Sequence, residues 1–329
     1  MIEILSESAL ATVQDLGRLG ALSWGVGVSG AMDPLALEAG NLLLGNAPDA
    51  AAVEVQIFPF QVRFDAACAF AVTGGGGPVR LGERELPPWW CGMAAAGEVL
   101  RLGVPKRGTT HGSRAYLCLV GGVDVPPVLN SRSTQLRGAF GGHEGRGLRR
   151  GDRLAAGTLG WGARPLWFGI VPPSLTLPCE RDGLPAVRVL PAAEYDSFTP
   201  ASQQAFWAEP WTITPQSDRY GYRLSGPVLE AIAFRELRSH GIVPGVIQVP
   251  RGGQPIVQMR DAQPSGGYPK IGTVIDADLW RLGQAPIGSR FRFIEASWDE
   301  ALAAADETRR WLASIERLVG LHTLGTGGR

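Results

Sequence analysis

The densest group of side chains that could carry out chemistry lies between Gly245 and Lys270. Asp261 and Gln263 stand just before the pair Gly266-Gly267, and Lys270 closes the segment. A carboxylate, an amide, an amine and exposed backbone N–H groups together suit an acyl-transfer or carboxyl-transfer site. The alternative is a Gly-Gly turn capped by Asp261. We favour the functional interpretation.

Three residues around this segment are candidate catalytic groups: Asp261, Lys270 and His240, which lies in Ser239-His240-Gly241. A histidine can act as a general acid or base, although a lone histidine is more often a hydrogen-bonded structural group. The candidate substrate-binding residues of the same segment are Gln248, Gln263, Ser265, Gly266, Gly267 and Tyr268.

A second polar stretch, Gln216 to Arg223, adds Arg219 and Tyr222 to the candidate substrate-binding residues. Two arginines near a turn suit a carboxylate or phosphate ligand, because a guanidinium can donate two parallel hydrogen bonds. A surface turn that carries ion pairs would explain the same residues.

A third polar cluster lies near the N-terminus and supplies Gln14, Asp15, Arg18 and Ser29 as candidate substrate-binding residues. Ser29 comes just before Asp33-Pro34, a helix start, and a helix N-terminus favours anions. Turn chemistry and helix capping would explain the cluster equally well. The glycine-rich loop from Ser131 to Gly145 is either a binding loop or an excursion over the fold.

Several site classes are not supported. The run Gly74 to Gly77 follows a strand, but the next residues are extended and open no helix, so a dinucleotide-binding turn is rejected. No P-loop motif is present. The four cysteines form no C-x-x-C pair and no cluster with histidine, so we expect no metal site. No Ser-His-Asp arrangement can be assembled.

The composition limits the partners. The 329 residues carry 31 Lys plus Arg and 31 Asp plus Glu, so the net charge is zero, and we expect neither nucleic acid nor a membrane as a partner. The N-terminus lacks the basic start and apolar run of a signal peptide, and no apolar run approaches the ~20 residues that span a bilayer. We therefore expect a cytoplasmic protein.

The elements that must position these residues are mostly short strands. Glycine and proline, 45 and 25 residues, alternate with apolar residues along the whole chain, which indicates many strands and tight turns in a barrel or sandwich. Helices are predicted after Asp33, after Thr199 and from Ser297 to about Val319, each with a capping residue at its start. Gly40 inside the first helix indicates close packing.

The predicted organisation is an N-terminal β-barrel unit over residues 1–163 and a Pro-rich linker over 164–185. A C-terminal β-barrel unit with the final helix covers 186–319, and a frayed tail covers 320–329. The fold class is therefore mainly β with a few helices.

Together these segments resemble the family of the 5-oxoprolinase C subunit, also described as allophanate hydrolase subunit 2-like or biotin-dependent carboxyltransferase-like, which includes the Kip antagonist. The resemblance covers nearly the whole chain. It rests on motifs in one order: Thr12 to Asp15, Ser29 to Asp33, Gly121 to Pro127, Arg219 to Arg223, Gly245 to Pro250 and Gly266 to Lys270. Ser239-His240-Gly241 looks more like the bacterial 5-oxoprolinase member of the family than like the other relatives.

The resemblance implies two cyclophilin-like β-barrel units. It also implies a component of ATP-dependent 5-oxoprolinase, which opens 5-oxoproline to glutamate together with A-like and B-like partner subunits. ATP would be used by the complex, and whether this chain binds it stays open. One alternative is the carboxyltransferase component of a biotin-dependent urea or amide carboxylase. Another is a non-catalytic regulatory partner of the Kip antagonist type.

The chain departs from the family pattern at two places. Pro264-Ser265 stands where the family usually has two threonines, and Tyr220 stands where methionine is common. Ser265 keeps a hydroxyl, but Pro264 removes both a hydroxyl and a backbone N–H. If that N–H contacts the ligand, the ligand differs or binds less tightly.

Overall fold

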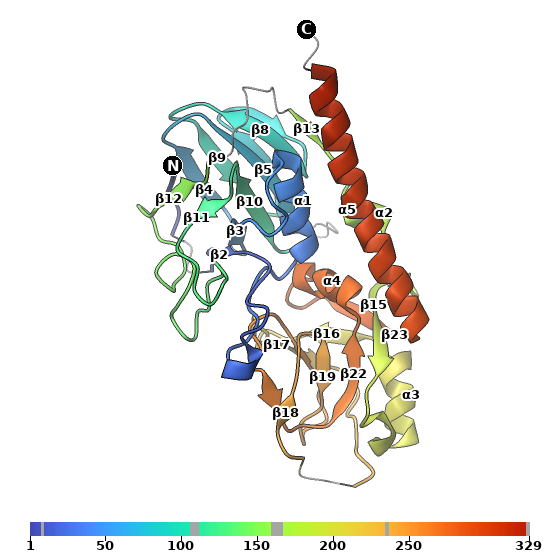
Figure 1. Ribbon diagram of the computed structural model, residues 1–329. Helices are drawn as coiled ribbons and strands as arrows, with labels where there is room; N and C mark the ends of the chain where they lie inside the picture. The colour runs from blue at the N-terminus through green and yellow to red at the C-terminus, as the bar shows by residue number, and fades with distance from the viewer. Residues whose placement is uncertain (8–9, 106–111, 159–166, 234–236, 327–329) are drawn as a thin grey trace. The chain divides into compact units, whose positions relative to one another are not determined.

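A computed structural model describes residues 1–7, 10–105, 112–158, 167–233 and 237–326 (Figure 1). The chain forms two compact units. The first comprises residues 1–18, 29–176 and 309–329, and the second comprises 19–28 and 177–308. The predicted linker 164–185 contains the change from the first unit to the second, at Thr176–Leu177. Its predicted start, at 163/164, lies outside the described residues.

The first unit contains two antiparallel sheets. The seven-stranded sheet has the order β11-β12-β1-β4-β9-β6-β7, and the six-stranded sheet has the order β13-β8-β5-β10-β3-β2. The bounds of the first sheet are β1 (Ile2–Ile4), β4 (Phe60–Phe64), β6 (Val79–Leu81), β7 (Arg84–Leu86), β9 (Val99–Leu102), β11 (Val123–Asp124) and β12 (Arg153–Ala156). Those of the second are β2 (Thr12–Gln14), β3 (Ala52–Val55), β5 (Cys68–Gly74), β8 (Trp90–Ala94), β10 (Ala115–Leu119) and β13 (Phe168–Gly169).

Alternating apolar side chains build the core between these sheets. In β4, Phe60, Val62 and Phe64 are buried while Arg63 between them is exposed, which is the period of two expected for a strand with one face on the core. Phe64 contacts Phe70 of β5, with ring centroids 5.5 Å apart. The core therefore follows the apolar pattern of the sequence.

Helix α1 (Pro34–Leu44) covers the six-stranded sheet at β5 and β10 (Figure 1). Its predicted start is confirmed, because the Asp33 carboxylate accepts a hydrogen bond from the N–H of Ala36 at 2.9 Å. Close packing at Gly40 is also confirmed: a Cβ there would lie 2.6 Å from the Sγ atom of Cys118. Only glycine allows the helix to approach the sheet this closely.

The second unit is a closed barrel. Its eight-stranded sheet has the order β14-β15-β22-β19-β20-β17-β16-β23, and an additional parallel pairing of β15 with β23 closes the ring. The bounds are β14 (Glu180–Arg181), β15 (Leu184–Pro191), β16 (Trp211–Ile213), β17 (Gly221–Ser225), β19 (Val246–Gln248), β20 (Ile256–Gln258), β22 (Lys270–Val274) and β23 (Arg290–Glu295). A separate two-stranded ribbon pairs β18 (His240–Gly241) with β21 (Ser265–Gly266).

The helices of the second unit lie beside its barrel. Helix α3 (Pro200–Ala208) begins at the predicted cap Thr199, whose hydroxyl accepts from the N–H of Ser202 at 3.2 Å, and it runs along β23 (Figure 1). Its Phe206 stacks on Phe293 of β23, with ring centroids 4.7 Å apart. The remaining short helices are α2 (Pro173–Thr176), α4 (Leu279–Gln284), η1 (Leu22–Trp24), η2 (Tyr195–Ser197) and η3 (Asp276–Asp278), of which α2 belongs to the first unit.

The final helix, α5 (Trp298–Thr326), is longer than predicted. The capping box is confirmed, because Glu300 and Ser297 exchange hydrogen bonds through side chain and backbone. The predicted end near Val319 is wrong, and so is the frayed tail for residues 320–326, since the helix continues to Thr326. The rest of the predicted tail, 327–329, lies outside the described residues. Gly320 lacks the Cβ that favours a helix, but Ile315 and Val319 are buried in a core cluster of the first unit, and this packing outweighs the low propensity of Gly320.

Candidate active site

The pairing of β19 with β22 brings two candidate site residues together. Gln248 and Lys270 are directly opposite each other in the register of this pair, next to an irregularity between Ile247 and Gln248. The irregularity places two residues of β22, Lys270 and Ile271, against Gln248, and Lys270 is the one paired with it. Lys270 is the first residue of β22.

The Lys270 side chain is buried, with only 6% of the residue exposed. Its ammonium group donates a hydrogen bond to the backbone oxygen of Tyr268 at 3.1 Å. Burial lowers the pKa of Lys270 below its ordinary value, and the negative charge of Glu194 partly opposes this shift. A buried amine with a lowered pKa is a common property of catalytic and ligand-binding lysines.

The amide of Gln248 lies in the same polar row. Gln248 is 1% exposed, and its side-chain oxygen accepts a hydrogen bond from the amide of Gln258 at 3.0 Å. The side-chain nitrogen of Gln248 has no hydrogen-bond partner among the described residues. It faces Gly266: a Cβ on that glycine would lie 2.5 Å from it. Gln248 and Gln258 therefore lie on one face of the barrel sheet, and Lys270 is paired with Gln248 on the next strand; we call these three residues the polar row.

The ribbon of β18 and β21 holds three more predicted residues. His240 pairs with Gly266, and Gly241 pairs with Ser265. Gly267 approaches the same chain segment, since a Cβ there would lie 2.8 Å from the backbone oxygen of Leu237. Gly267 thus allows backbone to approach backbone, and Gly266 allows the ribbon to lie close to the Gln248 side chain.

Glu194, at the start of η2, is a site residue that the sequence analysis missed. Its carboxylate accepts from the N–H of Lys270 at 3.3 Å and lies 3.9 Å from Nε2 of His240. The other ring nitrogen of His240 lies 3.0 Å from the backbone oxygen of Arg238. No local motif marks Glu194. Gln258, which was also missed, could have been found, because Val246-Ile247-Gln248 and Ile256-Val257-Gln258 share one pattern.

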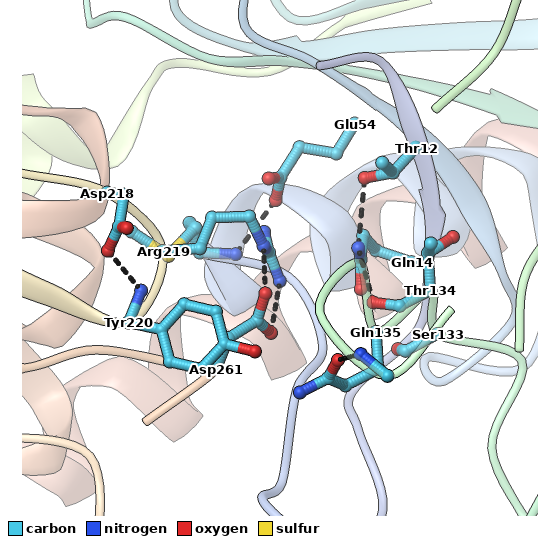
Figure 2. Close-up of polar contacts among 12 residues, drawn as sticks. Thr12, Gln14, Glu54, Ser133, Thr134, Gln135, Asp218, Arg219, Tyr220 and Asp261 are labelled. Carbon is cyan, nitrogen blue, oxygen red and sulfur yellow. Dashed lines mark hydrogen bonds and ion pairs between the residues drawn. The ribbon is translucent and has the colours of Figure 1, made fainter. Parts of the chain in front are cut away.

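Arg219 and Asp261 form a buried ion pair (Figure 2). Nε of Arg219 donates to one carboxylate oxygen of Asp261 at 2.9 Å, and a terminal nitrogen donates to the other at 3.2 Å. The backbone N–H of Asp261 also donates to the oxygen of Arg219 at 2.9 Å. The structure therefore joins two predicted site residues, one catalytic and one substrate-binding, to each other.

The remaining predicted residues of the second unit are spread over different environments. Tyr222 is 1% exposed and pairs with Val257, so it lies on the opposite face of the sheet from Gln258. Gln263 is exposed, and Tyr268 is 51% exposed. The structure does not bring these three side chains into the polar row.

In the first unit, Asp15 holds two loops together. Its carboxylate accepts from the N–H of Gly17 at 2.8 Å, the hydroxyl of Ser131 at 2.7 Å and the N–H of Arg132 at 2.5 Å. The hydroxyl of Ser133 donates to it as well. The loop from Ser131 to Gly145 therefore begins as an ordered segment fixed to the N-terminal turn.

Arg18 supports the same contact between the two loops. Its guanidinium donates to the backbone oxygen of Ser133 and lies over the ring of Phe140, 4.7 Å from the centroid. Arg18 is fully buried. The predicted residues Asp15 and Arg18 are thus brought together by the loop that begins at Ser131.

Gln14 and Ser29 are buried beside this loop cluster. The amide of Gln14 donates to the hydroxyl of Thr12 at 2.9 Å and to the oxygen of Thr134 at 3.3 Å (Figure 2). Its side-chain oxygen, and the hydroxyl of Ser29, have no hydrogen-bond partner among the described residues. Ser29 also has a φ of +55°, in the left-handed region that non-glycine residues rarely adopt. Strain of this kind occurs often at functional sites.

A buried network fixes the segment that follows Ser29. The Glu54 carboxylate accepts from the N–H of Met32 at 2.8 Å and from the hydroxyl of Tyr116 at 2.7 Å. The same hydroxyl accepts from the N–H of Asp33 at 2.8 Å. Burial, with the charges of Glu54 and Asp33, raises the pKa of Tyr116. Tyr116 therefore stays a neutral structural group.

The site contains no activated thiol among the described residues. Cys68, Cys91, Cys118 and Cys179 are all free, and burial raises the pKa of Cys91 to about 12. A thiol is a good nucleophile only as the thiolate. Within the described ranges, no three His, Cys, Asp or Glu residues are grouped so that they could hold a metal ion. No helix of the described residues is long and apolar enough to span a bilayer.

Residues 24–295 match the family model described as carboxyltransferase domain, subdomain A and B. The chain belongs to this carboxyltransferase domain family. It is 41% identical to the 5-oxoprolinase C subunit of Escherichia coli, over 96% of this chain and 97% of that protein. It is also 41% identical to the 5-oxoprolinase C subunit of Haemophilus influenzae, over 97% of this chain and 99% of that protein.

A solved structure shows the same fold. The crystal structure of Kluyveromyces lactis urea carboxylase superposes with a TM-score of 0.84 at 27% identity, over 95% of this chain and 29% of that one. The predicted fold class, mainly β with a few helices in two cyclophilin-like β-barrel units, is confirmed, and so is the family resemblance.

Proposed function

We propose that the chain is the C-type subunit of an ATP-dependent 5-oxoprolinase, which opens 5-oxoproline to glutamate together with A-like and B-like partner subunits. The observation that carries this proposal is the 41% identity, over nearly the full length of both chains, to a protein named as the C subunit of 5-oxoprolinase. Two relatives with this name match end to end, which distinguishes them from the urea carboxylase, where the matched region is 29% of the protein.

The proposed reaction places clear demands on a site. The lactam C–N bond breaks, water supplies the oxygen of the new carboxylate, the nitrogen takes up a proton, and ATP is hydrolysed to ADP and phosphate. The substrate is a small ring with one carboxylate and one amide carbonyl. A cation, a hydrogen-bond donor and a group that moves protons are therefore needed together.

The second unit supplies the first two. Lys270 would hold the substrate carboxylate, and the backbone amides at Gly266-Gly267 would stabilise the developing oxyanion. The chain has lysine at only two positions, 106 and 270, and uses arginine at its other basic positions. A lysine at a buried position within a chain so rich in arginine supports a role that needs an amine.

His240 would move the proton. It is exposed at the ribbon, and Glu194 lies beside its Nε2 atom. Asp261 was the other candidate for this role, but both of its carboxylate oxygens accept hydrogen bonds from Arg219. We therefore propose that Asp261 and Arg219 position the loop that leads to Gly266. In the first unit, Gln14 and Ser29 keep the candidate role of ligand contacts.

We assign ATP binding to a partner protein of the complex. The run Gly74 to Gly77 joins β5 to β6 without a helix. Its glycines fit backbone packing instead: a Cβ on Gly75 would lie 2.2 Å from the backbone of Gly112. This run therefore offers no helix N-terminus to a phosphate. A cytoplasmic location, where ATP is available, is part of the same proposal, and the four free thiols fit a reducing compartment.

The alternative is a carboxyltransferase component that uses biotin carried by a partner. The fold it shares with urea carboxylase favours this alternative. A donor such as the Gln248 amide suits a ureido carbonyl as well as a lactam carbonyl. An assay of the reaction, and not the geometry, has to distinguish the two substrates.

The test is co-expression of this chain with its A-like and B-like partners, followed by measurement of glutamate release from 5-oxoproline and ATP. We expect ATP-dependent release that needs all three chains. No release from the complete complex would contradict the proposal. Transfer of carboxyl from carboxybiotin to urea would favour the alternative. Unchanged release after both Lys270→Ala and His240→Ala would favour a non-catalytic regulatory role.

A further inference from the structure

The buried side-chain nitrogen of Gln248 needs an explanation. Buried polar groups in folded proteins almost always have a hydrogen-bond partner, and each exception calls for a reason such as a ligand. Gln248 is 1% exposed, and its nitrogen has no partner among the described residues. A neutral amide N–H buried in this way would be satisfied by an acceptor oxygen that arrives with a ligand.

The amide of Gln248 pairs with a neighbouring amide. Gln258 donates to the side-chain oxygen of Gln248 at 3.0 Å, so the nitrogen of Gln248 is the atom that remains for a ligand. Gln258 is itself 5% exposed. The side-chain nitrogen of Gln248 is therefore available to donate a hydrogen bond to a ligand. Both glutamines lie on strands of a closed barrel, which hold side chains more firmly than loops do.

The position of Lys270 restricts the ligand further. Gln248 and Lys270 are paired with each other on β19 and β22. A ligand that spans both would place a neutral carbonyl oxygen at the amide and an anionic group at the ammonium. The adjacent residues thus match a small, planar amide that carries a carboxylate.

Gly266 covers the donor. It lies so close to Gln248 that a Cβ on it would be 2.5 Å from the side-chain nitrogen. Its strand, β21, pairs only with β18 among the described strands, in a ribbon separate from the barrel sheet. A ribbon with two paired residues on each strand can shift without breaking the barrel ladder. Ligand entry requires this shift.

We propose that Gln248 determines substrate specificity by donating a hydrogen bond from its side-chain nitrogen to the amide carbonyl oxygen of the substrate, while Lys270 receives the carboxylate. The β18–β21 ribbon moves aside only while the substrate enters. The inference rests on the proposed function and deepens it by giving each polar end of the substrate its own residue. A purely structural glutamine would not need to face Gly266 with an unsatisfied donor.

The test measures equilibrium binding to the complete complex without ATP, using three probes. These are 5-oxoproline, pyrrolidin-2-one, which keeps the carbonyl and lacks the carboxylate, and cyclopentanecarboxylate, which keeps the carboxylate and lacks the carbonyl. The variants are Gln248→Met and Lys270→Met. Gln204→Met, at an exposed position of α3, is the matched control.

We expect Gln248→Met to weaken binding of 5-oxoproline and pyrrolidin-2-one about tenfold, the effect of one lost hydrogen bond, and to leave cyclopentanecarboxylate unchanged. Lys270→Met should show the opposite selectivity. Gln204→Met should change none of the three. Gln248→Glu, which exchanges the donor for an acceptor at nearly equal volume, should weaken the carbonyl probes at least as much as Gln248→Met.

Equal weakening of all three probes by Gln248→Met, or of none, would overturn the inference. Thermal unfolding of each variant shows whether a general loss of binding comes from misfolding, and Gln248→Glu then supplies the selectivity test. This binding test is independent of the test of the proposed function. If the wild-type complex releases no glutamate, the proposed function is contradicted. The relative affinities of the three probes still show whether Gln248 contacts the carbonyl oxygen.

Discussion

The loop cluster around Asp15 and the polar row of Gln248 and Lys270 contain similar residue types but differ in how their hydrogen bonds are completed. Asp15 accepts from two backbone N–H groups and two hydroxyls of its own unit. Gln248, by contrast, is buried with a donor that has no partner among the described residues. Both clusters lie in family motifs, so motif position alone does not separate them.

Whether the hydrogen bonds of a polar cluster are complete indicates whether the cluster stabilises the fold or binds a ligand. A carboxylate with several donors stabilises the folded chain, because each donor would be unsatisfied without it. An unsatisfied buried donor lowers stability and is kept where a ligand completes it. Substitution in the first cluster should therefore lower stability, and substitution in the second should mainly affect binding.

The largest effect is expected for Asp261→Ala. Asp261 is 2% exposed and both of its oxygens accept from Arg219, so the substitution takes this anion away from a buried guanidinium. Breaking a buried ion pair in this way costs about 3–5 kcal/mol in the free energy of unfolding. Urea unfolding of the chain, followed by circular dichroism, measures the loss.

The matched control is Asp49→Ala at an exposed position, for which we expect a change below about 0.5 kcal/mol. If Asp261→Ala left stability unchanged and abolished glutamate release, Asp261 would belong with the polar row as a catalytic group, and not with the saturated clusters.

Asp15→Asn is expected to have the next largest effect. An asparagine keeps the shape but replaces a carboxylate oxygen with an NH2 group, which cannot accept from the serine hydroxyls or backbone N–H groups around it. We expect a loss of about 2 kcal/mol, the range for a hydrogen bond to a charged group. Amide exchange at Arg132, whose N–H donates to Asp15, should become faster.

Asp124→Asn, at an exposed position of β11, is the control and should alter neither quantity. A variant of Asp15 with wild-type stability but weakened 5-oxoproline binding would show that the first-unit cluster contacts the ligand, and the distinction between the two clusters would fail.

Sequence patterns predicted the elements better than the partnerships. The helix after Asp33 and the strands of the barrel follow from capping residues and apolar alternation, which are local properties. The pairing of Arg219 with Asp261 joins residues 42 positions apart, and that of Ser131 with Asp15 joins residues 116 apart. Such contacts depend on strand register and loop path, which no local pattern specifies. Each of these carboxylates was therefore visible as a candidate, while its saturation was not.

The neighbours of the residues in the polar row could not be predicted from local patterns either. Lys270 was predicted as a candidate catalytic group, because it closes a segment rich in polar side chains and glycine. The register of β19 with β22 then gave it Gln248 as its neighbour. Glu194 lies 76 positions from Lys270 and had no motif to mark it.

A smaller effect is expected for Gly266→Ala. The new Cβ would lie 2.5 Å from the side-chain nitrogen of Gln248, so the Gln248 side chain or the ribbon has to shift. We expect a loss of about 1 kcal/mol in stability, typical for a tight contact that relaxes. Faster amide exchange at Ile242, whose N–H donates to Pro264 at 3.0 Å, would report the displaced ribbon.

Gly241→Ala on the partner strand is the control, because a Cβ there meets nothing within 4 Å. Equal effects of the two substitutions would mean that the ribbon tolerates no side chain for reasons unrelated to Gln248, and the contact between ribbon and polar row would lose its significance.

The smallest expected effect is a dependence of the free energy of unfolding on pH that comes from Lys270. Burial lowers the pKa of this amine in the folded chain below its ordinary value of 10.5. Between the two pKa values the unfolded chain binds more protons than the folded chain, so stability rises with pH through that interval. Below the interval, the buried charge is a constant destabilising contribution.

Lys270→Met removes this contribution, so the variant should be more stable than the wild type at neutral pH, and the difference should decrease as the pH approaches 10.5. Lys270→Arg stays charged at every pH tested, so the difference in stability between Lys270→Met and Lys270→Arg should not decrease as the pH rises. Urea unfolding at neutral and alkaline pH measures the difference. A difference between wild type and Lys270→Met that does not change with pH would mean that the environment of Lys270 resembles the solvent. Only Gln248 would then distinguish the polar row from the loop cluster around Asp15.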